Sequence, residues 1–177
     1  GAPARTGLSD SMQPGAIAAL AVSNEPVFTA RFSTPLPPQD QLYWRGVVLG
    51  DYDGATWTRR GAGRAPASDS RIDIALEGPP SHYAVTLPAN GQRRIFALDV
   101  PRSIERLPGN PYVVSSALEV LTIQPITSTV HYRVSSQPRY RLQAGLSLAQ
   151  QQPWLALPAG SNPRSVAWAR QLRGSGA

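Results

Sequence analysis

Hydrophobic and polar residues alternate with a period of two along most of the chain, which is the pattern of half-buried β-strands. In residues 27–33, for example, Phe28, Ala30 and Phe32 share one face. The same alternation recurs at 71–76, 82–87, 94–100, 119–124 and 129–136, and the last two segments are expected to pair with each other. Residues 42–49 are apolar on both faces, as in a central strand. Turn-forming residues separate these segments, so the sequence predicts a mainly β fold, an antiparallel β-sandwich that is immunoglobulin-like or similar.

Two segments have a helical pattern instead, one near each end. Pro14–Val22 places Ile17 and Leu20 on one face, and Asn162-Pro163 combines a capping side chain with a proline suited to the first helical position. We therefore expect short helices near both ends. The expected organisation is a linker at 1–13, a β-sandwich domain at 14–160, and the start of a further helix at 161–177.

The amino-acid composition excludes some classes of function but reveals no further motif. The chain has 177 residues, 41% of them hydrophobic, which is enough for one domain with its own core. No apolar run approaches the ~20 residues of a membrane-spanning helix. All basic residues are arginines, and the net charge is +6. Because these arginines are scattered and not interleaved with aromatics in a recognisable motif, we expect no nucleic-acid partner.

Reactive side chains are scarce. The sequence has no cysteine and no lysine, which excludes thiol nucleophiles, cysteine-type zinc sites and a P-loop lysine. Its two histidines, His82 and His131, fall on the polar faces of predicted strands. Asp51 to Gly54 begins like a calcium loop but lacks the later ligands, so a hairpin turn is favoured. We predict no catalytic residue, no cofactor site and no metal site.

An aromatic hairpin is the remaining candidate. Around the predicted Asp53-Gly54 turn, the side chains of Tyr52, Asp53, Trp57 and Arg59 form a candidate interaction surface. For Trp44, just before this hairpin, a place in the core is favoured over a ligand platform. For Trp57 the two interpretations are about equal.

Several segments resemble one family in the same order along the chain. LYWRGVVLGDYDGATWTR (Leu42 to Arg59), RTGLSDSMQPG (Arg5 to Gly15), RRIFALDVP (Arg93 to Pro101) and LPAGSNPRSVAWARQLR (Leu157 to Arg173) resemble the bacterial membrane-anchored transglutaminase-like proteins of the TgpA type. The resemblance implies a periplasmic region that follows the last helix of an inner-membrane bundle. It also implies that a Cys-His-Asp site, similar to that of protein-glutamine γ-glutamyltransferases, lies beyond residue 177. No residue of this chain matches that site.

Two functional hypotheses follow. The first is a non-catalytic periplasmic accessory or protein-interaction domain, whose partner is its own downstream transglutaminase core or another periplasmic protein. The alternative is a glycan- or peptidoglycan-binding module that uses the Tyr52/Trp57 hairpin, with Arg59 pairing with glycan carboxylates. In both hypotheses, contact with the membrane is made by the helices of the parent protein.

Overall fold

The computed structural model describes residues 10–14, 26–59, 73–105, 107, 109–115, 117–143 and 148–174, and every structural statement below concerns this part of the chain. Its elements are β1 (Ser11–Met12), β2 (Thr29–Phe32), a 3-10 turn (Gln39–Gln41), β3 (Asp51–Tyr52), β4 (Trp57–Thr58), β5 (Asp73–Glu77), β6 (Ser81–Leu87), β7 (Arg94–Ile95), β8 (Val100–Glu105), β9 (Tyr112–Val114), β10 (Val120–Thr122), β11 (Val130–Gln137), β12 (Arg139–Gln143), α1 (Leu148–Leu155) and α2 (Pro163–Gly174). All strand pairings are antiparallel, which confirms the predicted mainly β class.

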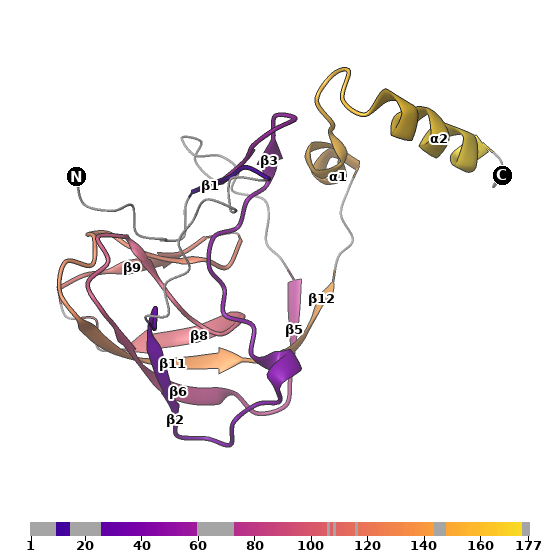
Figure 1. The fold of residues 1–177 in the computed structure, drawn as a ribbon. Helices are drawn as coiled ribbons and strands as arrows, with labels where there is room; N and C mark the ends of the chain where they lie inside the picture. The colour runs from indigo at the N-terminus through magenta and orange to yellow at the C-terminus, as the bar shows by residue number, and fades with distance from the viewer. Residues whose placement is uncertain are drawn as a thin grey trace.

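Two sheets enclose the hydrophobic core. A four-stranded sheet has the order β2-β6-β11-β8, and a three-stranded sheet has the order β7-β10-β9 (Figure 1). The predicted alternation is clearest in β6, where every second residue from Ser81 to Leu87 is buried. Core residues come from both sheets and from the turn between β7 and β8. The predicted inward faces of 82–87 and 129–136 are therefore confirmed.

Two buried tyrosines fasten the β7–β8 connection to the larger sheet. The Tyr132 hydroxyl accepts from the Phe96 N–H and donates to the Phe96 carbonyl, each at 2.9 Å. The Tyr83 hydroxyl accepts from the Leu98 N–H at 2.7 Å and lies 2.8 Å from Ser136 Oγ. Burial raises the pKa of Tyr83 to about 12 and also raises the pKa of Tyr132. These hydroxyls satisfy backbone groups that the strand ladder leaves open.

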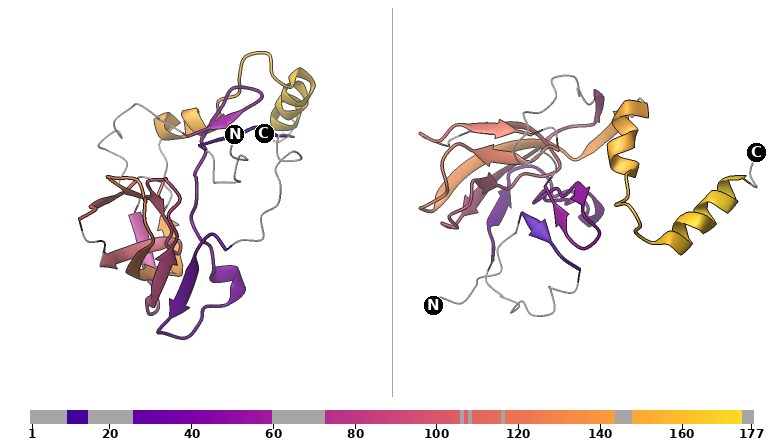
Figure 2. Two further views of the ribbon diagram at one scale, coloured as in Figure 1. Left: turned by 60° about the vertical axis from the view of Figure 1, so that its left-hand side comes forward. Right: turned by 90° about the horizontal axis from the view of Figure 1, so that it is seen from above.

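Smaller units extend from this sandwich. A three-stranded sheet of order β1-β4-β3 lies on the side of α1, and a two-stranded ribbon of β5 and β12 runs from the sandwich toward α1 (Figures 1 and 2). The last helix, α2, begins at Pro163, where the Asn162-Pro163 signal predicted a helix start. The helix expected at Pro14–Val22 falls almost entirely outside the described residues.

Three strand predictions were wrong. Residues 94–100 contain β7 and the first residue of β8, with Phe96 to Asp99 between them, instead of one strand. Residues 42–49 form a single bridge between Trp44 and Leu98, not a central strand. The Arg45 N–H still donates to the Ala97 carbonyl at 3.2 Å, but the Val48 N–H donates to the Glu119 carboxylate at 3.0 Å. The predicted pair 119–124 and 129–136 does not form: β10 pairs with β7 and β9, whereas β11 pairs with β6 and β8. The division into 1–13, 14–160 and 161–177 stays a prediction, although β1 shows that residues 11 and 12 join a sheet.

Candidate functional site

The aromatic hairpin is formed by β3 and β4. Tyr52 pairs with Trp57, and their rings stack at 4.7 Å between centroids with 24° between planes. The loop therefore has four residues instead of the two of a type I′ turn. Gly54 has φ +107°, a region that favours glycine, and its carbonyl accepts a 2.7 Å hydrogen bond from the Tyr52 hydroxyl. Both aromatic side chains are half-buried against each other.

Asp53 is exposed, and its carboxylate is hydrogen-bonded within its own loop. Its Oδ1 accepts hydrogen bonds from the N–H groups of Ala55 at 2.8 Å and Thr56 at 2.7 Å. These backbone donors lower the pKa of the Asp53 carboxyl, because they stabilise its charged form. Asp53 thus fixes the loop conformation.

The fourth candidate, Arg59, points away from this surface. Its Nη2 donates to Oε2 of Glu119 at 2.7 Å, and its Nη1 lies 3.8 Å from Oδ1 of Asp10. The structure therefore brings Tyr52, Asp53 and Trp57 together on the hairpin and directs Arg59 toward the sandwich.

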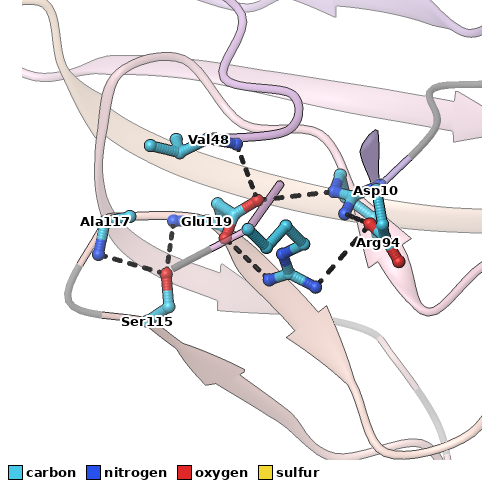
Figure 3. Close-up of polar contacts among 7 residues, drawn as sticks. Asp10, Val48, Arg94, Ser115, Ala117 and Glu119 are labelled. Carbon is cyan, nitrogen blue, oxygen red and sulfur yellow. Dashed lines mark hydrogen bonds and ion pairs between the residues drawn. The ribbon is translucent and has the colours of Figure 1, made fainter. Parts of the chain in front are cut away.

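Arg59 belongs to a partly buried group of charges that sequence reasoning missed. We call Asp10, Arg59, Arg94 and Glu119 the charged cluster (Figure 3). Glu119 and Arg94 are 3% and 4% exposed. Arg94 Nη2 donates to Asp10 Oδ1 at 2.9 Å, and its Nε lies 3.8 Å from Glu119 Oε1. The Glu119 N–H donates to Ser115 Oγ at 3.1 Å, which fixes the start of β10.

The charged cluster joins parts of the chain that are distant in sequence. Asp10 precedes β1, Arg59 follows β4, Arg94 lies in β7 and Glu119 precedes β10. Buried charges are tolerated only when paired and hydrogen-bonded, so these side chains hold the β1-β4-β3 sheet against the sandwich. The only sequence signal was an acidic residue inside the apolar run from Ala117 to Ile123.

A second polar cluster anchors β12. Asp99 is buried, and its carboxylate accepts hydrogen bonds from the guanidinium of Arg45 and from the hydroxyl of Tyr140. Burial, followed by the hydrogen bond to Asp99, raises the pKa of Tyr140 to about 12. The Arg45 guanidinium also lies 5.3 Å from the ring centroid of Tyr43. This cluster connects the sandwich to the ribbon.

Trp44 packs on the core, which confirms the favoured interpretation. Its ring contacts Phe28 at 4.9 Å and Tyr83 at 5.4 Å between centroids, both edge-on. The two histidines are exposed, as expected from their strand faces, and His131 Nδ1 lies 2.9 Å from Thr86 Oγ1. Within the described ranges, no group of three or more His, Asp or Glu side chains could hold a metal ion.

In the described part of the chain, no helix has the length and hydropathy needed to cross a membrane. The fold and the polar clusters define a mainly β domain whose buried charges connect separate segments of the chain. The family model described as "TgpA N-terminal domain" matches residues 1–143. The chain therefore belongs to the TgpA N-terminal domain family, which confirms the resemblance, and it is a periplasmic domain.

Known proteins agree with this assignment. The chain is 34% identical over 170 residues to a protein-glutamine gamma-glutamyltransferase from Pseudomonas aeruginosa, covering 95% of this chain and 24% of the relative. Crystal structures of the periplasmic domain of TgpA from P. aeruginosa, one of them bound to ethylmercury, are similar with TM-scores of 0.76 and 0.75 at 34% identity. The match covers 96% of this chain and 58% or 57% of those chains. The chain thus spans about a quarter of the curated relative's length.

Proposed function

We propose that this chain is a non-catalytic accessory domain of a membrane-anchored transglutaminase, and that it positions the transglutaminase portion in the periplasm. The parent would transfer the γ-glutamyl group of protein glutamines, as the name of the P. aeruginosa relative states for that protein. Recruitment of a second periplasmic protein is the other form of the same role.

One observation supports positioning: the β1-β4-β3 sheet includes the start of the described chain and lies next to Pro158, which precedes α2. Its first strand follows Asp10, in the segment that resembles the exit from the membrane helices. The tip of the β3–β4 hairpin lies against the connection between α1 and α2, where a Cβ atom on Gly54 would lie 3.9 Å from Cβ of Pro158. The charged cluster fixes this sheet to the sandwich. A single small sheet therefore links the membrane-proximal segment with the segment that precedes α2.

The experiment perturbs the hairpin tip in the full-length protein. Gly54→Leu adds a side chain against Pro158, and Gly91→Leu is the matched control, since Gly91 also has positive φ but has nothing within 4 Å of an added Cβ. Because small misplacements of catalytic groups cost large factors, we expect kcat/KM for glutamine–amine transfer to fall at least ~fivefold in Gly54→Leu relative to the control. Equal activities at equal Tm would overturn the positioning role.

The alternative is a glycan- or peptidoglycan-binding module that uses the Tyr52/Trp57 hairpin. The half-exposed aromatic stack favours it, but Arg59, the proposed partner for glycan carboxylates, is paired with Glu119. Soluble peptidoglycan fragments should then shift Trp fluorescence in the wild type and not in Trp57→Phe. If the fragments cause no shift in Trp fluorescence at millimolar concentration, this hypothesis is excluded.

A further inference from the structure

The ribbon of β5 and β12 has two chemically different faces. Its register pairs Leu76 with Tyr140 and Ile74 with Leu142. Directly opposite residues in an antiparallel pair lie on the same face, and side chains alternate along each strand. These four residues therefore form one face, called here the apolar face of the ribbon.

The opposite face of the ribbon is polar. Arg139 is paired with Glu77 in the register, and Arg141 donates from Nε to Oε1 of Glu77 at 2.6 Å. The ribbon is thus amphipathic in the manner of a sheet that has one solvated side and one packed side.

The base of the ribbon is fixed to the sandwich. The Gln137 amide donates to the carbonyls of Glu77 and Gly78, the latter at 3.1 Å, and Tyr140 donates to the buried Asp99. The chain thus enters and leaves the ribbon at defined points. The ribbon is a fixed projection whose orientation the sandwich determines (Figures 1 and 2).

The apolar face is only partly covered, because Ile74 and Tyr140 are half-buried whereas the two leucines are exposed. Leu76 is 40% exposed and Leu142 is 50% exposed. Two-stranded ribbons are marginally stable in water unless their apolar face packs against something. An amphipathic ribbon with two exposed leucines therefore needs a covering partner.

We infer that the apolar face of the ribbon is the surface on which the transglutaminase portion of the full-length protein packs, an inference that rests on the proposed function. The two solved TgpA periplasmic domains share this fold and have longer chains, of which this chain covers 58% and 57%. The ribbon's second strand, β12, is the last strand before α1 and α2, and it runs toward them. Chain that follows α2 therefore starts on the side of the sandwich toward which the ribbon runs.

Cysteine labelling in the full-length protein tests this placement. Leu142→Cys and Val113→Cys form a matched pair, because both residues are 50% exposed in strands of this domain. Labelling with a maleimide is followed by mass spectrometry of the peptides that contain each position, which separates them from any other cysteine. We expect position 142 to react at least ~tenfold more slowly than position 113, since burial restricts access to a thiol. Similar rates at the two positions overturn the inference.

Two further measurements identify what covers the apolar face of the ribbon. Protection that weakens on dilution would show that a second copy of the chain covers the ribbon, which also overturns the inference. Protection that is independent of concentration supports it, and Leu76→Gln should then raise amide exchange in the facing peptides of the transglutaminase portion, whereas Val114→Gln should not. If the apolar face of the ribbon is not protected, the comparison of Gly54→Leu with Gly91→Leu still tests the positioning role independently.

Discussion

Replacing Glu119 by Gln removes the central negative charge of the charged cluster while preserving side-chain size. The amide oxygen can still accept the hydrogen bond from the Val48 N–H, which is 3.0 Å long in the wild type. The 2.7 Å ion pair with Arg59 is lost, and so is the 3.8 Å contact with Arg94. Because Arg94 is 4% exposed, water cannot replace its missing partner.

The expected loss of stability follows from this burial. Breaking a buried ion pair by removing one partner costs about 3–5 kcal/mol. Asp10 still pairs with Arg94 at 2.9 Å and offsets part of this cost, so we expect a loss of about 2–4 kcal/mol. For a domain of this size each kcal/mol lowers Tm by about 2–4 °C, which gives a decrease of roughly 4–16 °C.

Urea unfolding at neutral pH measures this quantity, with Glu77→Gln as the control. Glu77 pairs with Arg141 on the surface, where the side chains are 43% and 81% exposed, so its loss should cost at most about 1 kcal/mol. A double-mutant cycle with Arg59→Gln isolates the ion pair. Equal losses of unfolding free energy in Glu119→Gln and Glu77→Gln would show that burial of Glu119 does not strengthen its ion pair.

Three other outcomes are expected. The pKa of Tyr83 is raised from 10.0 to about 12, so the folded state holds the hydroxyl proton more tightly than the unfolded state does. This difference contributes about 2–3 kcal/mol to the free energy of unfolding below pH 10, and the contribution is lost as the pH rises through 12. Alkaline unfolding monitored by circular dichroism should show this loss, reduced in Tyr83→Phe. Tyr140→Phe removes the hydrogen bond to Asp99 and should speed amide exchange in β5 and β12 but not in β6. Gly78→Ala places a side chain at φ +68°, while the exposed Arg139 guanidinium near the new Cβ can move aside; the strained φ should lower the unfolding free energy by about 1–2 kcal/mol.

The fold class could be predicted because alternation is local information. The strand from Ser81 to Leu87 needs only its own seven residues to show which side chains face inward. The hairpin at Tyr52 and Trp57 could likewise be located from its turn residues and aromatics, and the structure brings both side chains together.

The charged cluster could not be predicted, because its members are distant in sequence. Arg94 and Asp10 are 84 residues apart, and Arg59 and Glu119 are 60 apart. Nothing local distinguishes Arg59 from a solvated arginine, so it was assigned to the hairpin surface. The same limit explains the error at residues 42–49, whose apolar character reflects partial burial along the sandwich and not membership of a sheet.

The larger sheet can be completed only late in export, because its central strand β11 comes last in the chain. Of the four strands in the larger sheet, β11 is the last in the chain, yet it lies between β6 and β8. A chain that emerges amino end first therefore exposes two open strand edges until Gln137 has appeared. Pairings between distant strands form slowly, and open edges invite association with other chains. Until β11 has formed, β6 and β8 of this domain are therefore open to pairing with other chains.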